Sequence, residues 1–212
     1  MKTGILWDLD GTLLDTLADM TDAVNHTMEQ FGYPKRTMEE VRRFVGNGAR
    51  RLIALSVPEG ADVDAVLDVY REYYAANCQI KTKPYDGILE ALAVLGRKYP
   101  MAVVSNKPDN AVKPLCAQYF PGIFARGESA DCPRKPAPDM LLKAMEAIGV
   151  ETCVYVGDSE VDAITAKAAG VPCLSVLWGF RDREEIEANG GMHFCENVAE
   201  LVEKLEELCN GK

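Results

Sequence analysis

The sequence predicts an α/β protein in which helices cover a parallel sheet and a helical segment is inserted after the first strand. Short apolar runs alternate with helical stretches from residue 101 onward, which favours right-handed βαβ units. Another short apolar run lies near the start of the chain. Between these two regions, residues 16–84 contain no convincing strand.

The predicted strands are continuously apolar, as expected for strands that are covered on both faces of a sheet. They are Gly4–Leu9, Met101–Ser105, Cys153–Val156 and Cys173–Leu177. Helical patterns accompany the later strands at Ala137–Ile148, Val161–Ala169 and Val198–Leu208.

The inserted segment has helical periodicity. Apolar residues recur at helical spacing between Leu17 and Phe31, and Asp62–Gln79 predicts another long helix. Thr37 followed by Glu40 predicts a capping box at the start of a helix between these two.

Glycine- and proline-containing breaks at 32–34, 46–48 and 58–60 divide the inserted segment into four pieces. We therefore expect two domains. Residues 1–15 and 85–212 would form the core, and residues 16–84 a helical cap.

The chain of 212 residues has a formal net charge of −10, so a nucleic-acid backbone or an anionic membrane is a poor candidate partner. No run approaches the roughly 18 apolar residues of a membrane helix. The residues from Met1 to Gly11 lack the pattern of a signal peptide, so we expect a cytoplasmic protein. Seven cysteines without a CxxC pair predict reduced thiols, and neither a disulfide framework nor a zinc site.

Basic residues gather in the inserted segment around its central Gly-Asn-Gly, namely Arg42, Arg43, Arg50 and Arg51. They form either a solvated helix face or a lid that offers positive charge to an anionic substrate. In the second case Arg50 and Arg51 are the candidates for substrate contact.

Two acids stand at the end of the first strand. Asp8 and Asp10 are two residues apart, so their side chains emerge on the same side of the strand. Because like charges repel, such a pair favours a bound cation. Open α/β sheets bind ligands outside the carboxyl ends of their strands, where this pair lies.

Polar side chains also follow the later strands. Ser105, Asn106 and Lys107 end one strand. Asp158 ends another, with Asp162 one helical turn further on. Between them, the prolines after Lys135 and before the next helix fix the backbone that carries this lysine.

Together these groups predict phosphoryl transfer. The carboxylates of Asp8, Asp10 and Asp158 suit Mg²⁺, which prefers oxygen ligands. One carboxylate can attack phosphorus to form an aspartyl-phosphate, and a second acid can protonate the leaving oxygen and later activate water. Donors and positive charge for the phosphoryl oxygens come from Thr12, Ser105 and the fixed lysine.

The set resembles, in order, the four motifs of the haloacid dehalogenase superfamily. The similar segments are Asp8–Leu13 (DxDGT), Ser105–Asn106, Lys135–Pro138 (KPAP) and Gly157–Asp162 (GDxxxD). The resemblance covers essentially the whole chain. It implies a Rossmann-like core and, for residues 16–84, a mobile C1 cap.

The resemblance also implies a role for each matched residue. Asp8 would be the nucleophile and Asp10 the general acid and base. Mg²⁺ would be held by Asp8, the backbone oxygen of Asp10, and Asp158, with Asp162 supporting the metal site. The phosphate-binding residues would be Thr12, Ser105, Asn106 and Lys135.

Softer matches, at Phe44–Arg50, Pro84–Ile88 and Val176–Phe180, are similar to bacterial phosphoglycolate phosphatases and their pyrophosphatase relatives. They imply a Mg²⁺-dependent phosphatase acting on a small anionic phosphomonoester. The expected partner is a small phosphorylated metabolite, without nucleic acid or membrane, and the expected assembly is a monomer or homodimer.

Several alternatives stay open. Pyrophosphatases, sugar-phosphate phosphatases and β-phosphoglucomutase-like phosphomutases share the same motifs, and a mutase differs in a cap closure that the sequence does not display. A phosphonatase is disfavoured because Lys35, Lys81 and Lys83, the only cap lysines, lie in no apolar run. A non-catalytic binding protein is disfavoured because every catalytic position of the motifs is filled.

Overall fold

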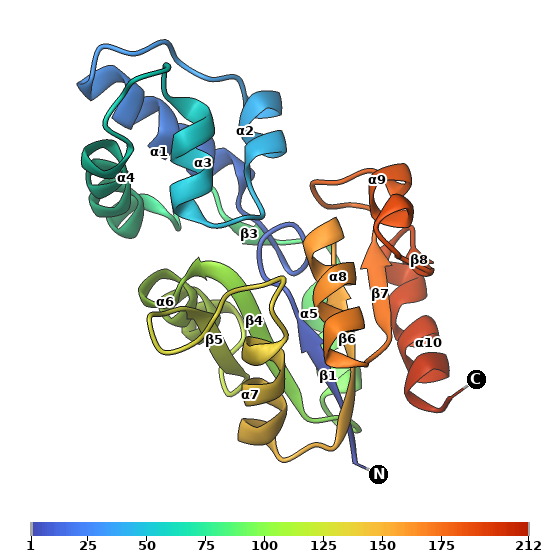
Figure 1. The fold of residues 1–212 in the computed structure, drawn as a ribbon. Helices are drawn as coiled ribbons and strands as arrows, with labels where there is room; N and C mark the ends of the chain where they lie inside the picture. Colours follow the sequence, from blue (N-terminus) through green and yellow to red (C-terminus); the bar gives the residue numbers. More distant parts are fainter. Residues whose placement is uncertain (1, 212) are drawn as a thin grey trace.

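The computed structural model describes residues 2–211 as a six-stranded parallel sheet with a group of four helices beside its carboxyl edge (Figure 1). The strand order is β5-β4-β1-β6-β7-β8. The strands are β1 (Thr3–Trp7), β4 (Met101–Pro108), β5 (Phe124–Glu128), β6 (Thr152–Gly157), β7 (Cys173–Val176) and β8 (His193–Cys195). The predicted α/β fold is confirmed.

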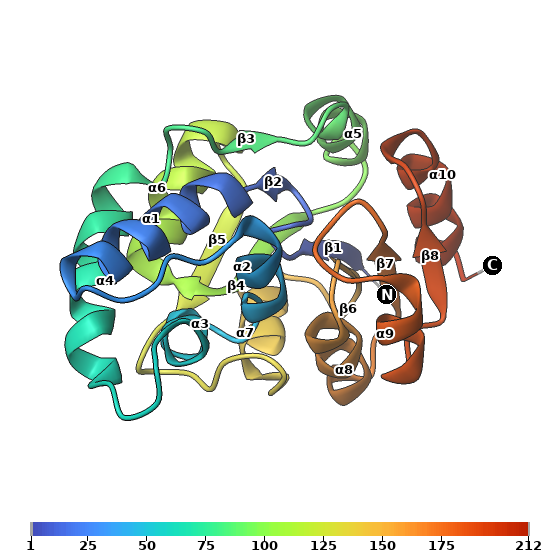
Figure 2. The same cartoon turned by 90° about the horizontal axis from the view of Figure 1, so that it is seen from above.

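Helices cover both faces of the sheet (Figure 2). They are α5 (Ile88–Leu95), α6 (Asp109–Tyr119), α7 (Asp139–Ile148), α8 (Glu160–Ala169), α9 (Arg183–Ala188) and α10 (Val198–Cys209). Alternate side chains of β1 point to opposite faces. Ile5 and Trp7 therefore pack in the cluster under α5, α6 and α10, whereas Leu6 packs in the cluster under α7 and α8.

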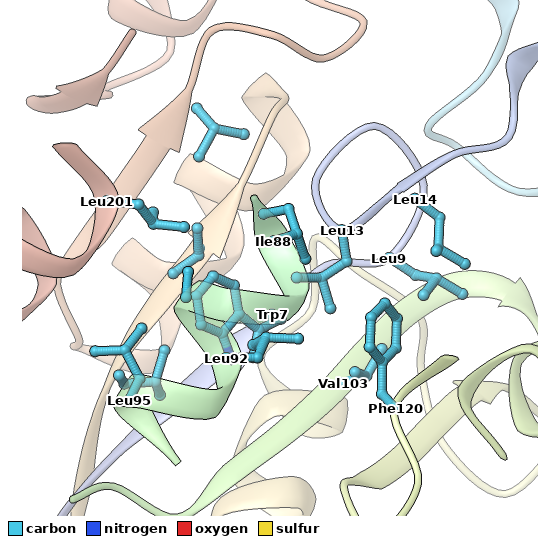
Figure 3. Packing of buried hydrophobic residues seen from close by; sticks show 14 of the residues in the cluster. Trp7, Leu9, Leu13, Leu14, Ile88, Leu92, Leu95, Val103, Phe120 and Leu201 are labelled. Carbon is cyan, nitrogen blue, oxygen red and sulfur yellow. The ribbon is translucent and has the colours of Figure 1, made fainter. Parts of the chain in front are cut away.

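The larger cluster continues beyond the strand into the loop that follows β1. Trp7 and Leu13 pack beside Leu92 and Ile88 of α5. Leu9 lies beside Leu14 and Phe120, and all of these side chains are buried (Figure 3). Burying such side chains stabilises the fold by about 1.5–3 kcal/mol each. The loop that carries the first acidic motif is thereby anchored on both sides.

The inserted segment forms α1 (Leu17–Gln30), α2 (Met38–Phe44), α3 (Ala49–Ser56) and α4 (Val63–Asn77), called the helical cap below. These helices share a buried cluster in which Val24, Met28 and Ile53 are fully covered, and Ala111 and Phe180 of the core also join it. The capping box predicted from Thr37 and Glu40 is present at α2.

The chain enters and leaves the helical cap through a short antiparallel pair, β2 (Leu14–Asp15) and β3 (Lys83–Pro84). The expectation that residues 16–84 contain no strand is therefore wrong at its last two positions. A two-residue strand is too short to show a period in its sequence. Its pairing depends on the partner strand that the fold brings beside it.

Two strands of the core were not predicted from the sequence. The first, β5, has the sequence FARGE, and β8 has only three residues. Both lie at the edges of the sheet, where burial is partial and a continuous apolar run is not required.

Within residues 2–211 no helix is both long enough and apolar enough to span a membrane. The seven cysteines are free thiols, five of them buried.

Candidate active site

The strand order brings the predicted motifs together. The central strand β1 lies between β4 and β6, and it pairs in parallel with both. Carboxyl ends of adjacent parallel strands meet at one edge of the sheet. Asp8 therefore follows β1 beside Ser105 of β4 and Asp158 after β6, and all three line one cavity facing the helical cap.

Neighbouring donors hold the Asp8 carboxylate through one of its two oxygens. Its Oδ1 accepts the backbone N–H of Leu9 at 2.7 Å and lies 3.0 Å from Nζ of Lys135. Among residues 2–211 no donor reaches the other oxygen, Oδ2. One oxygen is thus fixed and the other is available in the cavity.

Lys135 is almost wholly buried, although it comes from the loop before α7. The side chain of Asn106 binds its backbone twice, with Oδ1 accepting the Lys135 N–H and Nδ2 donating to the Lys135 carbonyl, each at 2.9 Å. Nζ donates to Asp162 at 2.7 Å and to the Tyr155 hydroxyl at 2.8 Å. Asn106, predicted to bind phosphate, positions this lysine in the structure.

Burial opposes the charged form of Lys135, but the neighbouring Asp162 and Asp8 outweigh it and raise the pKa of the lysine. The side chain therefore remains a cation in a site that excludes water.

Asp162 is saturated with donors. Its Oδ2 accepts the N–H and hydroxyl of Ser159, at 3.2 and 2.6 Å, in the capping box of α8. Its Oδ1 accepts Lys135 and the Tyr155 hydroxyl, the latter at 3.0 Å. Asp162 is thus bound to supporting residues on both oxygens.

Asp158 is oriented by two different donors. Its Oδ1 accepts the Thr12 hydroxyl at 3.2 Å, and its Oδ2 accepts the Phe180 N–H at 2.7 Å. Thr12, predicted to contact phosphate, is fully buried and directed at this carboxylate. Close approach of the backbone is required here, because a Cβ at Gly11 or Gly179 would come within 2.2–2.4 Å of the Asp158 carboxylate.

The buried acids fit a hard divalent cation. Carboxylate oxygens of Asp8, Asp158 and Asp162 lie within 4.8 Å of one another. Burial raises the pKa of Asp8 to about 7. The nearby Lys135 ammonium opposes this rise, whereas repulsion from Asp162 adds to it. Burial and repulsion from Asp162 and Asp8 raise the pKa of Asp158 well above its usual range. One lysine does not neutralise this cluster, and oxygen ligands of this kind suit Mg²⁺.

The side chain of Asp10 belongs to a second group. Its Oδ1 lies 2.7 Å from Nζ of Lys107, and that ammonium also donates to the hydroxyl of Tyr74 in α4 of the helical cap. Lys107 Nζ stands 4.7 Å from the centre of the Tyr74 ring, which stacks on Tyr70. The Asp10 carboxylate therefore connects the core to the cap instead of joining the acidic cluster.

The cavity lies between the sheet edge and the helical cap. Its empty volume, including the open mouth, is about 640 Å³. Apolar side chains from the cap, including Met20, Val45 and Leu52, line the cavity opposite the acids and Lys107 of the core. An apolar lining lowers the local dielectric constant and so strengthens the electrostatic interactions within the cavity.

Arg181 joins the two sides of this cavity. From the loop after β7 its guanidinium donates to carbonyls at the end of α2, those of Arg42 at 2.9 Å and Val45 at 2.7 Å. It also lies 3.2 Å from Glu160 and 3.5 Å from Glu185. Its guanidinium thus donates to carbonyls of the cap, and its charge is paired with two carboxylates of the core.

The predicted cap arginines lie elsewhere. Arg50 pairs with Asp64 at 3.0 Å on the exposed surface, and Arg51 is exposed. Neither lines the cavity, because Leu52 and Ile53 occupy the buried face of α3. Arg42 and Arg43 pair with Glu39, and Arg42 also reaches Asp182 of the core.

Sequence reasoning assigned no role in the site to several of its side chains, namely Lys107, Tyr70, Tyr74, Tyr155 and Arg181. Lys107 directly follows the second motif, and that position is the signal that could have found it. The tyrosines of α4 have the helical spacing of core residues, which conceals a polar role. Arg181 carries no local signal, because its partners are backbone carbonyls far away in sequence.

The chain is similar to known proteins over nearly its whole length. The profile of the haloacid dehalogenase-like hydrolases matches residues 5–176. Phosphoglycolate phosphatase 1 of Pseudomonas aeruginosa is 33% identical, over 93% of this chain and 78% of that protein. The phosphoglycolate phosphatase of Mesorhizobium japonicum is also 33% identical, over 95% of both chains.

Among solved structures, a protein from Lactobacillus delbrueckii subsp. bulgaricus has a TM-score of 0.88 and 37% sequence identity. The alignment covers 97% of this chain and 99% of that one, which is described provisionally as a phosphoglycolate phosphatase.

Proposed function

Because the chain belongs to the haloacid dehalogenase-like hydrolases, we propose that it is a Mg²⁺-dependent phosphatase acting on a small anionic phosphomonoester, phosphoglycolate or a close analogue. The observation that carries this proposal is that the Asp8 carboxylate is held through one oxygen while the other faces no donor among the described residues. Oδ1 is fixed by a backbone N–H and by Lys135, while Oδ2 is left for attack on phosphorus.

In this proposal the substrate lies in the cavity with its phosphoryl group at Asp8. Oδ2 of Asp8 attacks phosphorus, and the bond to the leaving oxygen breaks. The Lys135 ammonium beside Asp8 and the Ser105 hydroxyl provide positive charge and a donor for the phosphoryl oxygens.

Asp10 is the proposed general acid and base. It gives a proton to the leaving oxygen and then takes one from the water that attacks the aspartyl-phosphate. Its carboxylate lines the cavity outside the group of Asp8, Asp158 and Asp162, and Lys107 binds its Oδ1, which leaves Oδ2 for proton transfer.

Asp8, Asp158 and the backbone oxygen of Asp10 are the proposed Mg²⁺ ligands, with Asp162 supporting the site. When bound, Mg²⁺ supplies charge that keeps the carboxylates ionised and offsets the negative charge of the phosphoryl group. Thr12 and the Phe180 N–H orient Asp158 for this purpose.

We also propose that residues 16–84 act as a separate cap domain over the core. A buried cluster made almost wholly of cap residues, joined from the core by Ala111 and Phe180, supports this division, and so does the narrow connection through β2 and β3. Closure over the cavity would exclude water during transfer.

The proposed reaction is tested by measuring phosphate release with Mg²⁺ from 2-phosphoglycolate, pyrophosphate, hexose phosphates and nucleoside monophosphates. We expect release from phosphomonoesters, with the highest kcat/KM on 2-phosphoglycolate, and loss of release with chelator. Release from pyrophosphate alone, or from no monoester, would contradict the proposal.

Metal binding gives a separate prediction. In Asp158→Asn the amide oxygen can still accept the Phe180 N–H, and the amide nitrogen can donate to the Thr12 hydroxyl, so the fold should persist. At a hundredfold excess over Kd, Mg²⁺ should stabilise the wild type by about 2.7 kcal/mol. This corresponds to a rise of about 5–10 °C in Tm for a chain of this size.

In Asp158→Asn we expect this rise to be nearly abolished. Without Mg²⁺ the variant should melt no lower than the wild type, because one charge has left a repulsive cluster. Asp22→Asn, an exposed acid in α1 paired with Lys81, is the matched control and should keep the full rise. An equal rise in Asp158→Asn and Asp22→Asn would remove Asp158 from the metal site.

A further inference from the structure

Each of the two acids of the first motif is paired with a different lysine. Lys135 Nζ lies 3.0 Å from Asp8, the proposed nucleophile. Lys107 Nζ lies 2.7 Å from Asp10, the proposed proton donor to the leaving oxygen. An acid that protonates the leaving oxygen must lie beside the leaving group. Lys107 therefore lies on the leaving-group side of the cavity, and Lys135 on the phosphoryl side.

Lys107 has an unused donor. An ammonium carries three N–H donors. Asp10 and the Tyr74 hydroxyl take two of them, and within residues 2–211 no third acceptor is in hydrogen-bonding range. The side chain is only 3% exposed to solvent and lines the cavity. A buried cation with an open donor at the substrate cavity is poised for an anionic ligand atom.

The other cations near the cavity are already engaged. Arg181 also lines it, but its guanidinium is occupied by cap carbonyls and by Glu160 and Glu185. Lys135 is enclosed by Asp8, Asp162 and the Tyr155 hydroxyl. Of the described cations that line the cavity, Lys107 is the one that binds Asp10, and it keeps an unoccupied donor beside that acid.

A second polar group faces the same region. The hydroxyl of Tyr70 has no hydrogen-bond partner among the described residues, and Tyr70 lines the cavity one helical turn from Tyr74. Around these two groups the lining is apolar, with Met20, Leu52 and Phe180. The space beside Asp10 thus offers one cation and one hydroxyl within an apolar wall.

We propose that Lys107 is the specificity-determining residue, and that it binds a carboxylate carried by the leaving group of the substrate. The inference rests on the proposed phosphatase function and deepens it. Within the substrate class already proposed, it places recognition of the leaving-group carboxylate at a core lysine and not at the cap arginines. In a water-poor cavity an ion pair of this kind is far stronger than on an exposed helix.

The inference is tested with two phosphonates that differ in charge at one end. Phosphonoacetate carries a carboxylate, and phosphonoacetamide carries a neutral amide of nearly the same shape. Both are measured by calorimetry with Mg²⁺ present, so the result does not depend on turnover. We expect the wild type to bind phosphonoacetate at least tenfold more tightly.

Lys107→Met should reduce this preference to within about threefold, while the affinity for inorganic phosphate changes little, since a point charge is lost only on the leaving-group side. Lys107→Arg should restore part of the preference. Lys107→Gln replaces the methionine variant should that variant fail to fold, as judged by circular dichroism.

Two results would overturn the inference. One is an absence of preference in the wild type. The other is an unchanged preference in the folded Lys107 variants. Lys107 would then only hold Asp10, and its replacement would lower kcat equally on all substrates. Failure of the proposed function is a different observation, namely a wild type that distinguishes the phosphonates but hydrolyses no phosphomonoester.

Discussion

Asp8→Asn should abolish turnover, lowering kcat by several orders of magnitude on every substrate. The amide has no charge with which to attack phosphorus and is a poor metal ligand. The fold should survive, because the amide oxygen can still accept the Leu9 N–H and Lys135 Nζ, while Lys135 keeps Asp162 as its counter-ion. The loss is therefore expected in chemistry and not in stability.

Steady-state kinetics together with urea unfolding separate these two effects. Asp22→Asn, the exposed acid in α1, removes one carboxylate from the surface and should retain wild-type kcat. A folded Asp8→Asn protein that keeps more than about a tenth of the wild-type rate would exclude Asp8 as the nucleophile.

Lys135→Met should lower the free energy of unfolding by about 3–5 kcal/mol, because removing one partner of a buried ion pair leaves uncompensated charge. The lysine is 2% exposed in its side chain and Asp162 is 0% exposed, so water cannot replace the lost ammonium. Loss of activity should accompany the loss of stability, since Asp8 would no longer be oriented by Nζ.

Lys143→Met is the matched control, and Lys143 lies in α7, the helix that follows Lys135. Lys143 pairs with Asp131 at 3.5 Å on the surface, and its side chain is 43% exposed. Such pairs contribute about 0–1 kcal/mol. Urea unfolding should therefore place the two variants several kcal/mol apart, and near-equal values would show that Lys135 is not a buried structural cation.

The fold could be predicted from the sequence wherever burial leaves a local pattern. The central strands β1, β4 and β6 are covered on both faces, so their apolar runs predicted them, whereas the edge strands β5 and β8 lack such runs. The helical cap was predicted from its 3.6-residue period and its breaks. The pair of β2 and β3 depends on tertiary pairing, and no local pattern indicated it.

The site could be predicted less completely, since its motifs name residues but not their partners. Asp8, Ser105 and Asp158 line one cavity because their strands are adjacent. Arg50 carried the expected charge, yet the buried face of α3 belongs to its apolar neighbours, so the arginine lies outside. Lys107 belonged to the polar set predicted at the end of its strand, but only the fold shows that its ammonium contacts Asp10 and a tyrosine of the cap.

Asp8 is proposed to carry the phosphoryl group during turnover. The most direct measurement is a rapid acid quench of the wild type reacting with radiolabelled phosphomonoester and Mg²⁺, followed by mapping of the labelled peptide. We predict transient label on the peptide that contains Asp8, released by hydroxylamine as expected for an acyl phosphate, and no label in Asp8→Asn. Turnover without any protein-bound label, or label on another residue, would contradict the account.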